Sequence, residues 1–438
     1  MLKKRFTKVE WSWLFYDWAN SIWATNISAA IWPIYFAVVV EQLANAGRIN
    51  TIYGYAVSAA NLITALLAPY LGAIGDFRGM KKKLWKWFML GGVVFTLFMA
   101  VFDNWVLMIL GFMLSRIGFS GSCLFYDSFL TDVTTPERMD KLSTWGYAMG
   151  YIGGSTIPFV ISIVILVALD MSILSYKIAI AIVSVWWLLF SIPFWKNVEQ
   201  VYYVDTPPRQ LKRNAWINMK NTLKEIVHNK AVFFFLLAYF FYIDGVDTII
   251  SIATNYGSTL GLGSIGMILA LVITQLVAVP CSIYFGSVSK KIGTLRLISA
   301  SVAMYVLITI VGFAMGFLID YNTLFGMTQE QAISISTVLF WILATLVGTV
   351  QGGIQALSRS YFGQLIPPER SNEYYGFMDI FGKFSCVIGP ALYALVYRLT
   401  DKASLGVLSL IVLFIAGFVM LIVGKPYFRS VEHEEITG

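Results

Sequence analysis

The feature that most constrains this chain is a succession of twelve apolar stretches, each long enough to cross a lipid bilayer as a helix. About 20 apolar residues span the hydrocarbon core, where only helices or closed barrels satisfy every backbone polar group. Charged residues make up 13% of the chain, against about 25% in soluble domains. We therefore predict an all-α polytopic membrane protein with transmembrane helices near 12–39, 51–75, 84–102, 104–132, 142–169, 174–194, 230–257, 263–287, 294–318, 334–362, 372–399 and 404–424.

Lysine and arginine residues gather in alternate loops. Of the 31, 24 lie on the side of the N-terminus, 4 on the other side and 3 within spans. Because basic loops stay in the cytoplasm, we expect an integral, multi-pass protein of a bacterial plasma membrane with both termini cytoplasmic. The lipid bilayer then surrounds the protein. Because the basic loops on one side of the membrane account for the net charge of +7, we expect no nucleic-acid partner.

The two halves of the chain share duplicated turns. Gly72 and Gly286 follow the second and eighth spans, and each has a second glycine seven positions later and basic residues nearby. A Pro-Glu-Arg turn at 136–138 returns at 368–370. Internal repeats of half the chain length are typical of transporters, with a central site between the halves. We predict two six-helix pseudo-repeats at 1–194 and 230–424, a cytoplasmic linker at 195–229 and a cytoplasmic tail at 425–438.

The linker contains the amphipathic segment "WINMKNTLKEIV" at 216–227. Two interpretations stay open for it. It is either an interfacial helix lying on the membrane or a solvated helix packed on the bundle.

The first duplicated turn has a recognisable pattern. Its residues resemble the signature of the major facilitator superfamily between the second and third helices, and they are Gly72, Asp76, Arg78, Gly79, Lys81 and Lys82. Phe77 stands where that signature has a basic residue, so one charge of its network is missing or is supplied by Arg78. The second copy has Lys290 in place of the aspartate.

Six further phrases extend the resemblance over nearly the whole chain. "YDWANS", "FYDSFL", "GYAMGYIGG", "YIDGVDTI", "QGGIQALSRS" and "FGKF" together resemble the so-called unknown major facilitator family, which includes the fungal vacuolar amino-acid effluxers of autophagy. This resemblance implies the major facilitator fold, in which spans one, four, seven and ten line a central cavity.

Carboxylates interrupt the first span of each half, in "FYDWANS" (15–21) and "FYIDGVDT" (241–248). A charge near the bilayer centre costs at least about 2.5–3.5 kcal/mol and persists where it pairs or faces water. At 1.5 Å per residue, Asp17 lies about 8 Å from its span end and Asp244 about 21 Å from its own. Since Asp244 and Asp247 cannot easily both ionise in a low dielectric, we predict proton coupling there and a gating role for Asp17. Hydrogen-bonded helix packing beside Gly245 is the alternative for the pair.

Other polar residues within the spans are candidates for gating or substrate binding. Asp127 and Arg359 occupy equivalent repeat positions, which predicts an ion pair that latches the halves on the cytoplasmic side. Asp379 and Lys383 lie four residues apart and either join this gate or only neutralise each other. Arg116 either binds a substrate carboxylate or neutralises a neighbouring aspartate. The further substrate-binding candidates are Asn20, Gln351 and Gln355.

These patterns predict a secondary active transporter of a small solute, such as amino acids or other small organic metabolites. We expect alternating access, coupling to protons and a monomer. The three cysteines show no metal-binding spacing, and we expect no metal, no cofactor and no catalytic residue. A non-transporting sensor is the alternative. An intramembrane enzyme is disfavoured, because the glycine that paired-aspartate proteases have directly before the aspartate is Val246 here.

Overall fold

The computed structural model describes residues 5–41, 43, 45–205 and 211–437. Within them, twelve helical runs are long and apolar enough to cross a membrane. The prediction of an all-α protein with twelve transmembrane helices is therefore confirmed. The chain forms two compact units, one of Met1–Thr222 with Ile366–Ile380 and one of Leu223–Leu365 with Phe381–Gly438.

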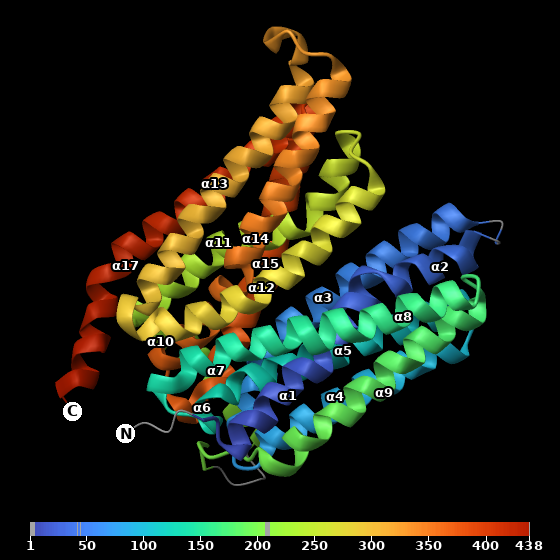
Figure 1. Cartoon of the computed structure of the whole chain (residues 1–438). Coiled ribbons are helices and arrows are strands. Elements are labelled where there is room, and N and C mark those ends of the chain that lie inside the picture. The colour runs from blue at the N-terminus through green and yellow to red at the C-terminus, as the bar shows by residue number, and fades with distance from the viewer. Residues whose placement is uncertain (1–4, 42, 44, 206–210, 438) are drawn as a thin grey trace. The chain divides into compact units, whose positions relative to one another are not determined.

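The first unit contains the first six spans (Figure 1). Helix α10 (Leu211–His228) begins in the first unit, and its last six residues belong to the second. The first unit also includes a short 3-10 turn, η5 (Pro368–Arg370), and the start of α15. Its other elements are α1 (Lys8–Ile22), η1 (Trp23–Ala29), α2 (Ile31–Glu41), α3 (Ala46–Gly75), α4 (Met80–Val101), α5 (Trp105–Ser128), α6 (Leu130–Val133), α7 (Pro136–Met149), η2 (Gly150–Thr156), α8 (Ile157–Ala168) and α9 (Ile173–Asn197).

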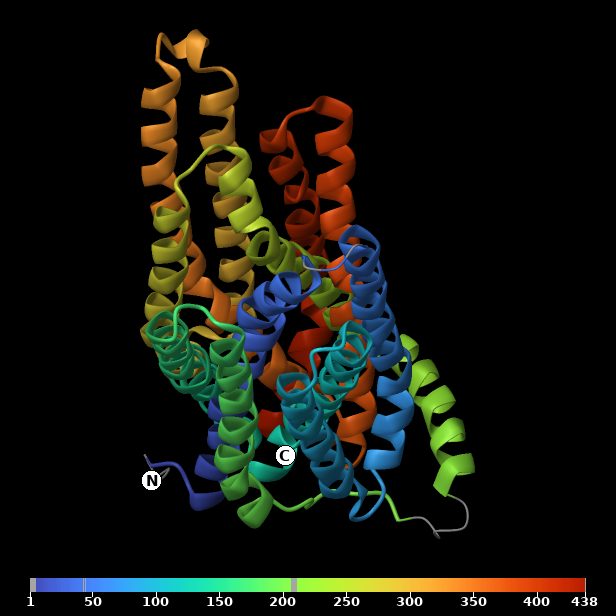
Figure 2. The ribbon, with the colours of Figure 1, turned by 90° about the vertical axis from the view of Figure 1, so that its right-hand side faces the viewer.

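The second unit contains the remaining spans, except for the first turns of α15. Figure 2 shows two of its long helices, α13 and α14 (orange), side by side up to the short η4 turn that joins them. The elements are α11 (Lys230–Thr259), α12 (Ser264–Ile292), α13 (Thr294–Asp320), η4 (Asn322–Phe325), α14 (Gln329–Leu365), α15 (Ser371–Thr400), α16 (Ala403–Ser409) and α17 (Ile411–Thr437).

The two units repeat one packing pattern. In the first unit the third span packs on the fourth and sixth, the first on the sixth, and the second on the fourth, through α4–α5, α4–α9, α1–α9 and α3–α5. In the second unit the corresponding contacts are α13–α14, α13 with α16 and α17, α11–α17 and α12–α14. Corresponding pairs of spans are thus in contact in both units.

Two spans of the first unit contain a turn of π-helix, η1 in the first span and η2 in the fifth. The two spans pack closely there. A Cβ atom on Gly153 would lie 1.8 Å from the Trp18 ring, and one on Gly150 would lie 2.6 Å from Ser21 Oγ. Single π turns are frequent at functional sites, and η1 and η2 lie in spans that contact each other.

The linker contributes two segments to the first unit: an extended stretch, residues 199–204, which we call the strap, and the first part of helix α10. Val204 forms an isolated bridge with Phe77, the loop residue that follows Asp76. Residues 206–210 of the predicted linker lie outside the described residues. Beyond them, Met219 of α10 packs against the buried pair Ala73 and Phe77. The predicted amphipathic helix therefore exists and packs on the bundle at this point, while Leu223 and Val227 are more than half exposed.

Candidate functional site

A buried carboxylate at the end of α3 binds the start of α15. Asp76 Oδ1 accepts hydrogen bonds from the Asn372 backbone N–H (2.9 Å) and side-chain Nδ2 (2.8 Å), and Oδ2 accepts from Glu373 N (3.0 Å). The first N–H groups of a helix lack partners within the helix and form its positive end. Asp76 therefore satisfies the N-terminus of α15, a helix that the sequence assigns to the second repeat.

Burial decides the protonation of this carboxylate. Asp76 is 2% exposed, and burial raises its pKa to about 7, although Lys81 and the N–H donors of Asn372 and Glu373 act in the opposite direction. The contact therefore contains a group that titrates near neutral pH.

Lys81 connects the same helix start to α4 and α6. Its ammonium is fully buried and lies 2.6 Å from Asp132 Oδ2, whose side chain is also buried. It donates further bonds to Ser371 Oγ (2.8 Å) and to Ser128 O (3.3 Å). A buried ammonium needs this number of acceptors, because leaving it unpaired would be costly.

Asp132 extends this network to the linker. Its Oδ1 accepts hydrogen bonds from Val201 N (2.7 Å) and Tyr202 N (2.9 Å). Gln200 Nε2 donates to the carbonyls of Gly75 (3.2 Å) and Asp76 (3.4 Å), and Val204 N donates to Asp76 O (2.8 Å). The segment after the sixth span is thus fixed on the loop between the second and third.

Of the other residues of the predicted loop motif, some allow close packing of helices and others lie at the protein surface. Gly72 permits the approach of α15, because a Cβ there would lie 2.3 Å from Asn372 O. Gly79 has φ of 71° and begins α4. Arg78 is exposed, 5.1 Å from the Tyr203 ring, and Lys82 pairs with Glu199. Phe77 stands where the motif has a basic residue. Its side chain packs in an apolar cluster with Ala73 and Met219.

Asp17 joins the first and fourth spans. Its Oδ2 accepts a 2.6 Å hydrogen bond from Tyr126 OH, and Trp13 Nε1 donates to Tyr126 O (3.0 Å). Asn20, one turn further along, is buried, and its Nδ2 lies 3.7 Å from Cys123 Sγ. The neighbouring Asp127 is half-buried on α5. The structure therefore brings Asp17 and Asn20 to α5, as residues of one helix contact.

Arg116 lies in a polar and aromatic setting in the same unit. Its Nε donates to Asn61 Oδ1 (2.5 Å) and its Nη1 to Ser28 Oγ (3.2 Å). The guanidinium carbon lies 6.0 Å from the Trp23 ring and 5.9 Å from the Phe112 ring. Ser28 and Trp23 belong to η1, so the π turn places a hydroxyl and a ring beside this cation.

Asp244 joins α11 to α15 in the second unit. It is fully buried, both of its oxygens lie 2.9 Å from Gly389 N, and Oδ1 also accepts from Thr248 Oγ1 (3.4 Å). A Cβ on Gly389 would lie 2.1 Å from Thr248 Oγ1, so only glycine allows this approach. Gly389 precedes Pro390, where a helix loses a regular backbone bond. These hydrogen bonds join α11 to α15 within the second unit.

The remaining candidates lie on α11, α14 and α15. Asp247 is half-buried one turn after Asp244. Gln351 and Arg359 are buried on α14 and Gln355 is half-buried between them. Asp379 and Lys383 are both half-buried on α15, the first within the first unit and the second within the second.

Two residues of the networks, Asp132 and Asn372, were not among the predicted site residues. Asp132 stands four residues before the first Pro-Glu-Arg turn, and Asn372 lies two residues after the second. The duplicated turns were therefore the available signal, because the network lies beside both of them.

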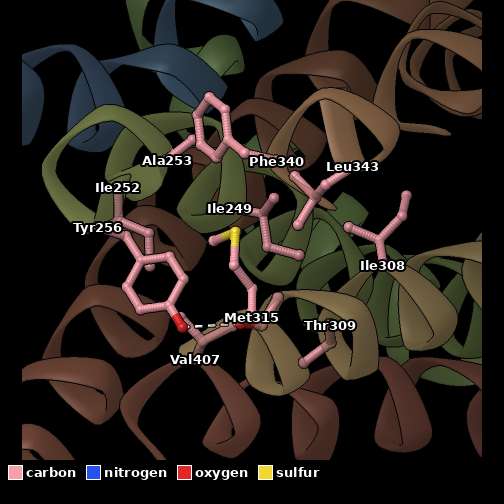
Figure 3. A pocket seen from close by; sticks show the side chains of 11 residues that line it. Ile249, Ile252, Ala253, Tyr256, Ile308, Thr309, Met315, Phe340, Leu343 and Val407 are labelled. Atoms are coloured by element: carbon pink, nitrogen blue, oxygen red, sulfur yellow. Dashed lines mark hydrogen bonds between the residues drawn. The ribbon is translucent and has the colours of Figure 1, made fainter. Parts of the chain in front are cut away.

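A cavity in the second unit is too small and too apolar for a solute (Figure 3). Its volume is about 20 Å³, and the side chains around it include Ile249, Phe340 and Met315. Tyr256 OH donates to Gly312 O (2.7 Å). Apolar cavities of this size stay dry. Among the described residues, no group of three or more His, Cys, Asp or Glu side chains could hold a metal ion.

Solved structures share this architecture at low sequence identity. The proton:xylose symporter XylE aligns with a TM-score of 0.65 and 14% identity over 94% of this chain and 93% of its own. A bacterial homologue of the iron transporter ferroportin, in an outward-facing state, aligns with a TM-score of 0.65 and 12% identity over 97% and 98%. These likenesses show the fold, so the chain is a multi-pass membrane protein with the major facilitator fold.

Sequence relatives narrow this class to one family. The profile of the family described as "Vacuole effluxer Atg22 like" matches residues 39–425, and the chain belongs to that family. The "Uncharacterized MFS-type transporter YxiO" of Bacillus subtilis (strain 168) is 40% identical over 96% of this chain and 95% of its own length. Autophagy-related protein 22-2 of Aspergillus clavatus is 27% identical over 62% of this chain and 46% of its own length. The protein is therefore a transporter and not an enzyme.

Proposed function

We propose that this protein is a secondary active transporter that moves a small organic solute carrying a carboxylate, with amino acids foremost, by alternating access. Its family is described as vacuole effluxers, which supports a solute of metabolic size. The basic loops support a bacterial plasma membrane with both termini in the cytoplasm, and the protein acts as a monomer.

The observation that carries this proposal is the setting of Arg116. Its guanidinium is half-buried within a span, where a charge is costly unless it serves function or structure. Its contacts with Asn61, Ser28 and two aromatic rings combine a cation, neutral hydrogen-bonding groups and apolar surface. An amino acid or related metabolite offers the complementary groups, since guanidinium binds carboxylate with two parallel bonds.

Proton coupling is assigned to the carboxylates of the seventh span. Asp244 is fully buried and bonded to the backbone of α15, so a change in its charge would alter the contact between α11 and α15. Asp247 is its half-buried neighbour. A carboxylate that is neutral in one conformation and charged in another ties conformation to the proton gradient.

The gate is assigned to the ends of the spans near the basic loops. Asp127 and Arg359 form its proposed ion pair, with Asp17, Asp379 and Lys383 beside them. The hydrogen bonds that Asp76 accepts from Asn372 and Glu373 are proposed to act as a latch, because α15 belongs to the second repeat in sequence. Alternating access requires this latch to open in the other conformation.

Transport by purified protein in liposomes tests the proposal. Wild type is expected to accumulate amino acids when a proton gradient is imposed, and Asp244→Asn is expected to abolish that accumulation while solute exchange continues. The matched control is Asp103→Asn, because Asp103 is a more than half-exposed carboxylate in the loop between two spans, where it pairs with Lys177. Equal accumulation by wild type and Asp244→Asn would leave Asp244 as a packing residue. Binding without flux in every condition would favour a sensor.

A further inference from the structure

A cavity at the ends of two membrane-spanning helices lies between the start of α4 and the end of α9 with the strap, residues 199–204. Its volume is about 540 Å³, within the range of small-ligand pockets. One wall is the basic turn at the start of α4, and the other is the end of α9 with the strap. The lining residues are Arg78, Gly79, Lys82, Lys83, Lys86, Trp195, Glu199, Gln200 and Tyr203.

The cavity is strongly cationic. Four basic side chains line it against a single carboxylate, Glu199. Glu199 pairs with Lys82, but its side chain is 69% exposed, so solvent screens this pair and a ligand can replace it. The N-terminus of α4 adds positive potential at the same place.

Aromatic rings hold two of the cations in place. The Lys86 ammonium lies 4.3 Å from the centre of the Trp195 ring, and the Arg78 guanidinium lies 5.1 Å from that of Tyr203. Such contacts orient the basic groups without neutralising them. The cavity therefore offers positive charge that its own residues leave largely uncompensated.

We propose that this cavity binds the phosphate group of an anionic ligand. Several lysines and an arginine around one cavity match an anion with more than one charged oxygen, and phosphate accepts bonds from both residue types. A phospholipid headgroup and a soluble phosphate compound share this chemistry. The lipid source is favoured by the position of the cavity at the start of a transmembrane helix, where cations and aromatic rings meet headgroups.

The outer face of α4 supports the lipid source further. Trp87 is 63% exposed and Val94, two turns along the same face, is 59% exposed. An acyl chain attached to a headgroup in the cavity would lie along this apolar face.

An occupied cavity would stabilise the attachment of the strap. Gln200 lines the cavity and also donates to the carbonyls of Gly75 and Asp76. A phosphate bound to both walls would compete with Glu199 for Lys82 and would join the strap to the turn. Ligand binding is therefore expected to raise the unfolding temperature.

Native mass spectrometry and thermal unfolding of delipidated protein in detergent test this site. The probes are phosphatidylglycerol, phosphatidylcholine as the lipid without net charge, and inorganic pyrophosphate as the soluble anion. In the double variant Lys83→Gln with Lys86→Gln, binding of the anionic probe is expected to fall about 25-fold, because each basic residue near an anionic headgroup contributes a factor of about five in affinity. The matched control is Lys290→Gln with Lys291→Gln, which removes the same charge from exposed residues of the corresponding turn.

A second variant guards against a fold defect. Glu199→Gln removes the only carboxylate among the described residues that line the cavity. Binding is expected to strengthen about threefold, which misfolding cannot produce. Charge-dependent binding of phosphatidylglycerol alone identifies a lipid site, and binding of pyrophosphate that displaces the lipid identifies a soluble phosphate ligand. The proposal would be overturned if wild type and the double variant bound phosphatidylglycerol and pyrophosphate equally well, or if wild type bound neither of these two anions.

Discussion

The turn at 72–86 and its repeat at 286–296 share a glycine skeleton but differ in their surroundings. In both, the second glycine has positive φ, 71° at Gly79 and 97° at Gly293, and a helix starts directly after it. In the first turn Asp76 and Lys81 are buried, Asp76 accepts hydrogen bonds from the start of α15, and Lys81 pairs with Asp132. In the second, Lys290 and Lys291 are exposed.

The difference separates two roles that one sequence motif combines. The glycines make a short connection between two helices, because glycine adopts positive φ at little cost, and this role is the same in both turns. The charges act only where other elements supply acceptors and donors. In the first turn these elements are α6, the strap and the start of α15, which bring Asp132, Val201 and Asn372 to the site.

Removing the buried ammonium should have the largest effect on this comparison. Lys81→Met leaves the Asp132 carboxylate buried without its cation, and the free energy of unfolding is expected to fall by about 3–5 kcal/mol. Lys290→Met, at an exposed position of the other turn, should change it by less than about 0.5 kcal/mol. Denaturant unfolding in one detergent measures both. Similar losses in the two variants would show that the two turns do not differ energetically.

The pH dependence of stability should distinguish the turns next. The pKa of Asp76 is raised to about 7 by burial, so the folded protein binds a proton that the unfolded chain releases near pH 4. The stabilisation is complete below pH 4 and is lost as pH rises through 7, with a slope of at most about 1.4 kcal/mol per pH unit. Asp76→Asn should reduce the slope of the unfolding free energy against pH between pH 4 and 7. An unchanged slope in that variant would assign the titration to another group.

The glycines should give the smallest effects. Gly79→Ala places a Cβ on a left-handed backbone, with φ of 71° and ψ of 3°, at an expected cost of about 1–2 kcal/mol. Gly293→Ala should cost more, about 2–3 kcal/mol, because φ of 97° with ψ of 134° lies outside the left-handed region that other residues adopt. Gly91→Ala is the control, since it lies within α4 and its added Cβ meets nothing within 4 Å. It should leave stability unchanged or raise it by up to about 1 kcal/mol. Equal losses in Gly79→Ala and Gly293→Ala, measured by thermal unfolding, would mean that the two turns share one backbone requirement.

The sequence by itself determined the number of spans and their helical nature. Hydrocarbon permits few alternatives to helices, and the duplicated glycines at 72 and 286 are local features that need no knowledge of distant residues. The positions of Asp17 and Arg116 within spans could also be predicted from the sequence, because a single charged residue is easily recognised among apolar neighbours.

The partners of these charges were decided only by the tertiary structure. Asp76 meets Asn372 across 296 positions of sequence, and Lys81 meets Ser371 across 290. Asp244 meets the backbone of Gly389, which has no side chain to signal the contact. A hydrogen bond is specified to a few tenths of an ångström and by its angle, whereas helical periodicity specifies only which face of a helix is apolar. The apolar pattern of the sequence therefore predicts which helices form, whereas the packing between helices determines which polar groups come into contact.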